Sequence, residues 1–279
     1  MTALDLGPAP PRRSPLEGLF ADAPAFARLG SFLALSLVVT LAAARIDPRP
    51  FQGESIWLKP IKFQLSLSLY LLTLAFFARY LPAGMRASRG WRIYALAVGL
   101  AVSAEMLWIA GAAALGTGSH FNVGSPLMAA LYPLMGVLAV LLTSATLVMG
   151  VAIGRNRHAG LAPALRLAVA LGLGLTFVLT VPVAGYMAAG TSHLVGTPAT
   201  GARLALLGWS GEVGDLRVAH FFAAHAMHIL PVAGLIAARG LPDRVARMAV
   251  IVAAVLYVAL VAATFGQAIA GQPFIAVRG

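Results

Sequence analysis

Seven apolar segments dominate the sequence, and all but the short first one are long enough to cross a bilayer fully as a helix. The hydrocarbon core of a bilayer is about 30 Å thick, so a spanning helix needs about 20 mostly apolar residues. Backbone groups in lipid must be hydrogen-bonded internally, and a helix does this within one segment. The expected spans are residues 29–44, 61–81, 91–115, 126–154, 163–190, 218–238 and 245–270. The sequence therefore predicts an all-α integral membrane protein, a bundle of seven transmembrane helices.

Composition supports this class and excludes others. The chain is 60% hydrophobic and 10% charged, whereas soluble domains contain about 45 to 50% apolar and about 25% charged residues. The net charge of +11 comes from single or small groups of arginines between apolar segments, which is the membrane pattern and not a basic face for nucleic acid. Without cysteine, the chain has no disulfide, thiolate metal site or cysteine nucleophile.

The distribution of basic residues predicts the orientation. With the N-terminus inside, the inner connections collect 13 basic residues and the outer connections 7 of the 20 in the chain. Because inner loops of membrane proteins are enriched in Lys and Arg, we expect the N-terminus inside and the C-terminus outside. We expect a multi-pass protein of the cell membrane, of the bacterial inner-membrane type.

The domain organisation follows from the spans. Residues 1–28 hold five prolines and are expected to form a flexible or interfacial tail. The small residues at 42–44 look like a signal-peptide cleavage site, but the long polar lead favours a retained first helix. Residues 29–279 form one transmembrane domain, in which residues 190–217 are long enough to form an ordered outer cap.

Polar residues concentrate on the outer side. The only two lysines, Lys59 and Lys62, lie within four residues of each other in a chain that otherwise uses arginine. They either anchor a helix end at the interface or contact an anion as point charges. The candidate contacts for a substrate or anion are Lys59, Lys62, Asn122, Arg217 and Gln267.

Three histidines mark the start of the sixth span. His225 and His228 lie about 140° and about 80° around the helix from His220, so one broad face holds all three. Arg217 lies near the middle of that face. Because polar side chains inside membranes are costly, they tend to face a cavity or a partner.

A single carboxylate lies at a matching depth. Glu105 is the only acidic residue in the expected spans, and its burial without a partner costs about 2.5 to 3.5 kcal/mol. It lies about 15 Å below the outer boundary, level with His228. We therefore expect Glu105 to pair with His225 and His228, and the third and sixth spans to touch there.

Several functions fit this group. The first is binding of a metal ion (Zn, Cu or Fe) or a haem, with a possible redox role, by Glu105, His120, His220, His225 and His228. The second is a proton-coupled transporter or permease that uses Glu105 and the histidines as a relay, beside a helix loosened by Pro231. A non-catalytic subunit of a membrane complex, a zinc hydrolase and a purely structural network are the further alternatives, and the partners are the lipid bilayer and a small-molecule ligand or neighbouring subunits.

Overall fold

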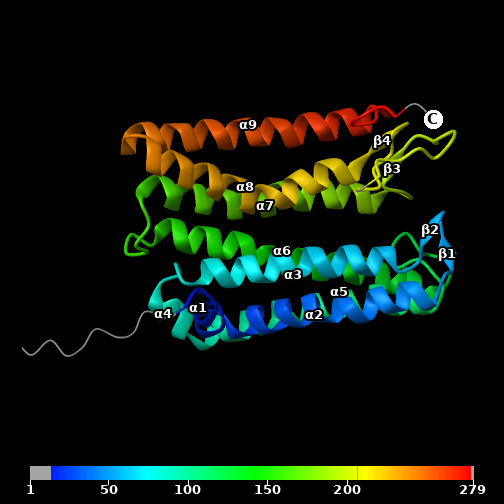
Figure 1. Cartoon of the computed structure of the whole chain (residues 1–279), viewed down its shortest axis with the longest axis horizontal. Coiled ribbons are helices and arrows are strands. Elements are labelled where there is room, and N and C mark those ends of the chain that lie inside the picture. Colours follow the sequence, from blue (N-terminus) through cyan, green and yellow to red (C-terminus); the bar gives the residue numbers. More distant parts are fainter. Residues whose placement is uncertain (1–13, 206, 278–279) are drawn as a thin grey trace, which may run out of the picture.

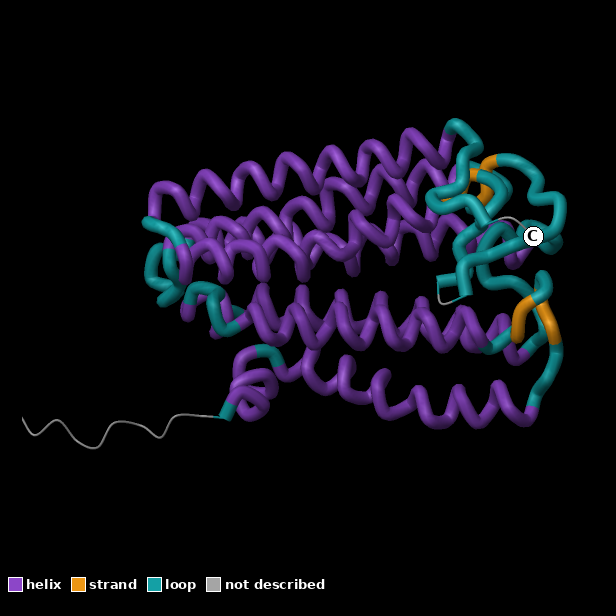
Figure 2. The backbone as a smooth tube through the Cα atoms, turned by 45° about the horizontal axis from the view of Figure 1, so that its top comes forward, coloured by secondary structure: helices purple, strands orange, loops and turns teal. Residues whose placement is uncertain are grey.

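The molecule is a bundle of long helices with short strands and loops gathered at one end (Figures 1 and 2). The computed structural model describes residues 14–205 and 207–277. Within them, the helices long and apolar enough to cross a membrane are α2 (Pro24–Ile46), α3 (Leu58–Ala78), α5 (Arg89–Ala114), α6 (Pro126–Arg155), α7 (Pro163–Ala189), α8 (Leu216–Gly240) and α9 (Asp243–Ile269). The seven-helix prediction is confirmed.

The short elements define the two ends of the bundle. Helices α1 (Pro15–Asp22) and α4 (Ala83–Ala87) lie at one end, which we call the α1 end (Figure 1). The antiparallel pairs β1 (Pro50–Phe51) with β2 (Glu54–Ser55), and β3 (Leu194–Val195) with β4 (Gly214–Asp215), lie at the other. We call this the cap end, and we use the name cap for the described residues of the expected segment 190–217.

Most of the described segment before the first expected span, residues 14–28, is helical. The Ser14 side chain accepts a hydrogen bond from the Glu17 backbone N–H, and the Glu17 carboxylate accepts one from the Ser14 backbone, so a capping box starts α1. Helix α2 begins at Pro24, five residues before the expected start. Residues 1–13 of the expected tail lie outside the described residues.

The helices pack as two groups. Helix α2 packs along α3, with α5 against both, whereas α7 packs against α6, α8 and α9. We call α1–α5 the first group and α6–α9 the second group. They are joined mainly where α5 packs against α6, and Thr73 of α3 also lies 3.1 Å from His228 of α8 across the boundary between the groups.

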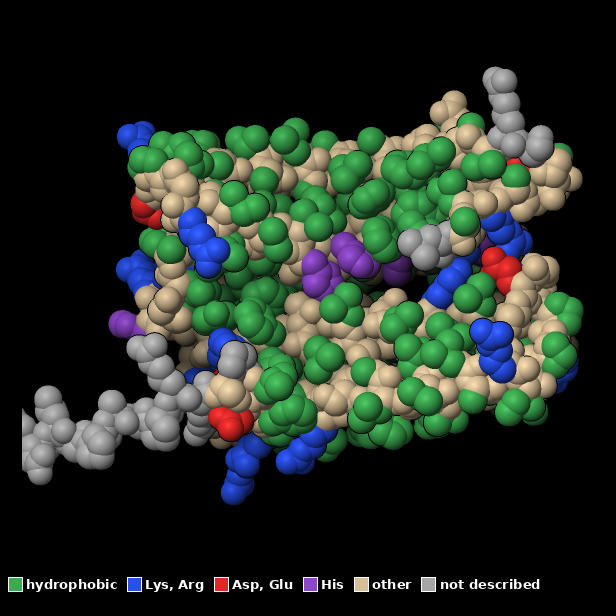
Figure 3. All heavy atoms as spheres, viewed as in Figure 1, with side chains coloured by type: hydrophobic (Ala, Val, Ile, Leu, Met, Phe, Trp, Pro, Cys, Tyr) green, Lys and Arg blue, Asp and Glu red, His purple; other side chains and the backbone are tan. Residues whose placement is uncertain are grey.

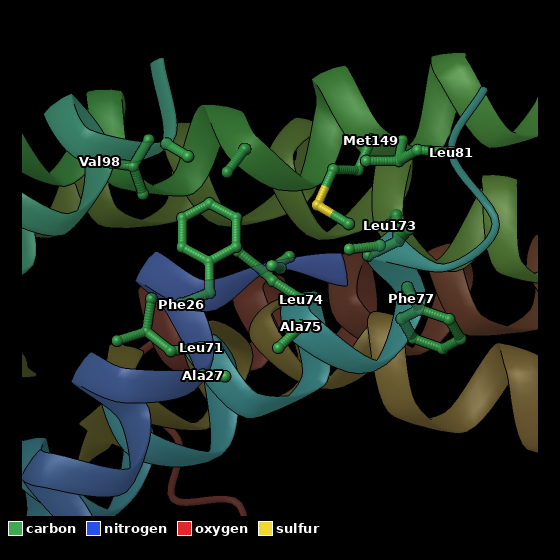
Figure 4. Close-up of a cluster of buried hydrophobic side chains, with 14 of the residues drawn as sticks. Phe26, Ala27, Leu71, Leu74, Ala75, Phe77, Leu81, Val98, Met149 and Leu173 are labelled. Atoms are coloured by element: carbon green, nitrogen blue, oxygen red, sulfur yellow. The ribbon is translucent and has the colours of Figure 1, made fainter. Parts of the chain in front are cut away.

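An apolar cluster fills the half of the bundle nearer the α1 end. Phe26, Leu74, Met149 and Leu173 are each 0% exposed and come from α2, α3, α6 and α7, and they lie against one another in Figure 4. Met227 of α8 joins the same cluster. Both helix groups therefore share a closed apolar core in this half.

Candidate functional site

The cap is held together by buried and half-buried carboxylates. Glu212 accepts hydrogen bonds from the backbone N–H groups of Thr200 at 3.0 Å and Ala202 at 2.6 Å, and from the Thr200 hydroxyl. These bonds, led by the one from the Thr200 hydroxyl, lower the pKa of Glu212 to about 2. The carboxylate therefore stays ionised and pins residues 199–202 over the bundle.

Asp215 and Arg217 form a second anchor at the start of α8. The Asp215 carboxylate accepts from the backbone N–H of Ser210 and of Arg217, both at 3.0 Å, and from the Arg217 guanidinium at 2.6 Å. Burial raises the pKa of Asp215, but the hydrogen bonds and charge of Arg217 outweigh it and leave the pKa lowered. The guanidinium also donates to the Gly208 carbonyl at 2.6 Å, so most of its hydrogen-bonding capacity is used inside the protein.

The cap also reaches the first helix group. Arg203 forms an ion pair with Glu54 of β2 at 2.6 Å. Lys62 of α3 donates to the Leu207 carbonyl at 3.4 Å. Gly208 has a φ of +69°, and a Cβ there would lie 3.1 Å from Lys62 Nζ, so glycine suits this turn. The cap thus connects the first and second helix groups at the cap end of the bundle.

Two of the expected ligand contacts bond within their own segments instead. The Asn122 side-chain amide donates to Thr117 Oγ1 at 3.0 Å and to the Gly118 carbonyl at 2.9 Å, which fixes the loop after α5. The Gln267 amide donates to the Pro273 carbonyl at 2.8 Å, which fixes the turn after α9. These contacts are structural.

Lys59, in the first turn of α3, has a different environment. Its side chain is half-buried, and no hydrogen bond or ion pair to it occurs in the described part of the chain. Its Nζ lies 6.0 Å from the centre of the Phe63 ring. It interacts electrostatically with Glu105, Arg217 and His120. Lys59, on α3, thus carries a charge that interacts with residues of α5, of the loop after α5 and of α8.

Glu105 does not pair as the sequence suggested. It is 5% exposed, and its Oε1 has no hydrogen-bond partner among the described residues. The expected ion pairs with His225 and His228 do not occur within the same part of the chain, and its electrostatic partner is Lys59. The polar contact of His228 is with Thr73 of α3 instead.

His228 makes the polar contact between α3 and α8. Its Nε2 lies 3.1 Å from Thr73 Oγ1, and that hydroxyl donates to the Leu69 carbonyl at 2.7 Å. Because a hydroxyl has one hydrogen, the Thr73 oxygen must accept from His228 Nε2–H. In neutral His228 the lone pair then lies on Nδ1, a buried atom without a partner among the described residues.

His225 presents a second lone pair beside it. Its Nδ1 lies 2.8 Å from the Phe221 carbonyl, which accepts only, so Nδ1 carries the hydrogen and Nε2 is free. The ring is stacked on Phe221 at 4.0 Å between centres, and the His225 and His228 rings lie 5.3 Å apart. His220, about two turns toward the cap, is half-buried and makes no hydrogen bond in the part of the chain that is described.

Two histidines outside the helices are held neutral. His120 lies in the loop after α5, with Nδ1 3.0 Å from Ser119 Oγ. Burial, helped by the positive charge of Lys59, lowers the pKa of His120 to about 3. Burial lowers the pKa of His193 in the cap to about 4. Neither ring therefore adds positive charge near Lys59 at neutral pH.

A hollow lies between the two helix groups on the face shown in Figure 3. Figure 3 shows histidine side chains in it, with Lys and Arg side chains nearer the cap end. We call this hollow between α3 and α8 the cleft. The apolar cluster of Figure 4 fills the half of the bundle toward the α1 end, and its residues Leu71, Leu74 and Met227 adjoin the contact between Thr73 and His228. The grooves of about 580 and 180 Å³ on the bundle are lined by none of the candidate residues.

The expected ligand set for a metal is not brought together. Among residues 14–205 and 207–277, no group of three or more histidine, aspartate or glutamate side chains is arranged to hold a metal ion. His120 lies with Lys59, whereas His225 and His228 lie beside Thr73. Comparison with known proteins finds no matching family model, characterised protein or solved structure.

Proposed function

We propose that the protein is a proton-coupled transporter that takes a small solute into the cleft. The observation that carries the proposal is that two ionisable side chains each have a buried atom without a hydrogen-bond partner among the described residues, Glu105 Oε1 and His228 Nδ1. Buried polar groups are nearly always satisfied by protein, water or ligand. Carboxylates and imidazoles also bind and release protons in membrane carriers.

The arrangement of the helices supports the same function. Two helix groups that share an apolar core at one end and leave a polar cleft at the other are suited to rocking about a central site. Pro231 lies inside α8, where it removes a backbone hydrogen bond three residues beyond His228. From the distribution of basic residues we infer that the cap lies outside and the α1 end in the cytoplasm of a bacterial cell. The cleft then faces the external medium.

Uptake into proteoliposomes tests this proposal. Purified full-length protein is reconstituted, and radiolabelled small solutes are screened for uptake driven by a pH gradient. We expect at least one solute to accumulate, and Glu105→Gln to abolish the dependence on the gradient. Glu17→Gln is the matched control, because it changes a carboxylate in α1, at the α1 end of the bundle. Equal uptake by wild-type protein and Glu105→Gln would refute the role of Glu105.

The second function is binding of a metal ion or haem, and the lone pairs on His225 and His228 favour it. Neighbouring imidazole nitrogens are common ligands of Zn, Cu and Fe, and one of them is a suitable axial ligand of haem. This proposal expects bound metal or a haem absorption band in the purified protein, with loss in His225→Ala. A colourless, metal-free preparation that stays so after loading would exclude it.

A further inference from the structure

A groove runs between the end of α2 and the start of α3, at the cap end of the bundle. Its volume is about 580 Å³, within the range of about 300 to 1,000 Å³ that is usual for ligand pockets. Its lining combines apolar side chains with a polar edge: Leu41, Ala42, Ala44, Leu58 and Ile61, with Arg45 and Ser55. The groove is therefore amphipathic and lies outside the cleft.

Nearer the α1 end, α2 and α3 are in direct contact. A Cβ on Gly30 would lie 3.0 Å from the Leu72 side chain, and Ser68 Oγ donates to the Gly30 carbonyl at 2.8 Å. The Gln64 amide donates to Ser36 Oγ at 3.0 Å. Beyond these contacts the groove opens beside the last turns of α2, a helix long and apolar enough to cross the membrane. The apolar part of the groove therefore faces lipid.

Arg45 provides a cation at the polar edge. Its side chain is exposed, and its guanidinium makes no hydrogen bond or ion pair in the described part of the chain. The acidic residues that flank it in the sequence on the cap side have other partners. Asp47 pairs with Arg49 at 2.7 Å, and Glu54 pairs with Arg203 at 2.6 Å. Arg45 is thus available to an anion from outside the protein.

The Ser55 hydroxyl adds a neutral donor at the same edge. Its Oγ accepts a hydrogen bond from the Trp57 backbone N–H at 3.4 Å, and its own hydrogen has no acceptor among residues 14–205 and 207–277. A hydroxyl donates one hydrogen bond, and arginine binds phosphate oxygens through two parallel hydrogen bonds. The polar edge therefore suits a phosphate group.

The apolar lining and the polar edge together select the ligand. A phospholipid supplies an acyl chain for the first and a phosphate for the second. Because Asp47 and Glu54 are already paired, neither is free to bind the cationic headgroup of a zwitterionic lipid. We propose that the groove binds an anionic phospholipid, with an acyl chain against Leu41 and Ile61 and the phosphate on Arg45 and Ser55. This site does not depend on the proposed transport function.

Native mass spectrometry of the delipidated full-length protein in an uncharged detergent tests the inference. The probes are dioleoyl phosphatidylglycerol, dioleoyl phosphatidylcholine, dioleoylglycerol and inorganic phosphate. We expect phosphatidylglycerol to bind about fivefold or more tightly than phosphatidylcholine, because one arginine near a membrane surface attracts anionic lipid by about 1 kcal/mol. Dioleoylglycerol, which lacks the phosphate, should bind more weakly than phosphatidylglycerol, and inorganic phosphate, which lacks the chains, should not displace the lipid.

Variants of Arg45 test the contact with the phosphate. Arg45→Gln should weaken the binding of phosphatidylglycerol about fivefold, whereas Arg45→Lys, which keeps the charge, should retain more affinity. Arg92→Gln is the matched control, because Arg92 is an exposed arginine of α5 near the α1 end. It should leave the affinity unchanged.

Variants of α2 test the groove without changing a charge. Ala42→Trp fills part of the groove and should weaken the binding of phosphatidylglycerol. Val39→Trp is the matched control, because Val39 is 71% exposed on the same helix and does not line the groove. Thermal unfolding of each variant shows whether it is folded.

Three results would overturn the inference. The first is equal binding of phosphatidylglycerol and phosphatidylcholine to the wild-type protein. The second is wild-type affinity for phosphatidylglycerol in both Arg45→Gln and Ala42→Trp. The third is displacement of the lipid by inorganic phosphate alone, which would indicate an anion site that does not use the apolar lining.

Discussion

The hydrogen bond between Thr73 and His228 gives the sharpest test of the cleft geometry. Thr73→Val removes the hydroxyl and keeps the shape, so His228 Nε2–H loses the acceptor that lies 3.1 Å away. The Leu69 carbonyl, which also loses the hydroxyl, keeps its place in the helix ladder. The main loss of stability therefore comes from the lost hydrogen bond between α3 and α8.

The size of the effect follows from the setting of the bond. Leaving a buried donor unsatisfied costs about 1 to 3 kcal/mol in water-soluble proteins, but interhelical side-chain bonds in bilayers average about 0.6 and reach about 1.7 kcal/mol. We expect the lower range, a change of about 3- to 18-fold in the unfolding equilibrium constant.

A double-mutant cycle isolates this energy. Thr73→Val and His228→Phe are measured singly and together by equilibrium unfolding in mixed micelles, with Thr73→Ser as the variant that keeps the hydroxyl. We expect a coupling energy of about 0.6 to 1.7 kcal/mol. A coupling energy indistinguishable from zero would refute the contact and the rotation of α8 that it defines.

Three further predictions concern packing, the cap and pH. Gly234→Ala places a Cβ 2.2 Å from a side chain of α7, whereas Gly240 has open space, so the first should lower the thermal unfolding temperature and the second should not. Glu212→Gln weakens the bonds that hold the cap, so trypsin should cleave after Arg203 faster than in wild type. Burial lowers the pKa of His193 from 6.5 to about 4, so its protonation favours the unfolded state. The stability of the protein should therefore be full above about pH 6.5 and fall as the pH drops toward 4. This fall should be smaller in His193→Gln.

The spans could be predicted closely because bilayer thickness and backbone satisfaction leave few alternatives. The expected segment 126–154 is α6 (Pro126–Arg155), and 163–190 is α7 (Pro163–Ala189). The first span was placed too short, because α2 begins at Pro24 after Ala23, which makes no side-chain capping bond that would mark a helix start.

The site was predicted in part. Residue counting predicted that Glu105 and His228 lie at the same depth, whereas Glu105 interacts with Lys59 at the start of α3 and His228 contacts Thr73 further along that helix. Which face of α8 meets which helix depends on packing, and the sequence contains no signal that distinguishes α3 from α5 as the partner of His228. Thr73 was missed for this reason. The use of lysine in a chain that otherwise uses arginine was the only sequence signal that made Lys59 a candidate.

The contacts inside the cap were beyond prediction. Glu212 bonds to backbone groups ten or more residues away, and backbone donors carry no sequence signature. The same holds for the Arg217 contact to the Gly208 carbonyl. The residue types were noticed, but their partners required the folded loop.

We expect water to reach the cleft from the cap end alone. The chain contains no cysteine, so a single introduced thiol reports access without background. We predict that a membrane-impermeant thiol reagent labels His225→Cys from the cap side of sealed vesicles and not from the α1 side. Ala145→Cys, at a position 0% exposed in the apolar cluster, should be unlabelled from both. Labelling of His225→Cys from the α1 side, or from neither side, would contradict the account.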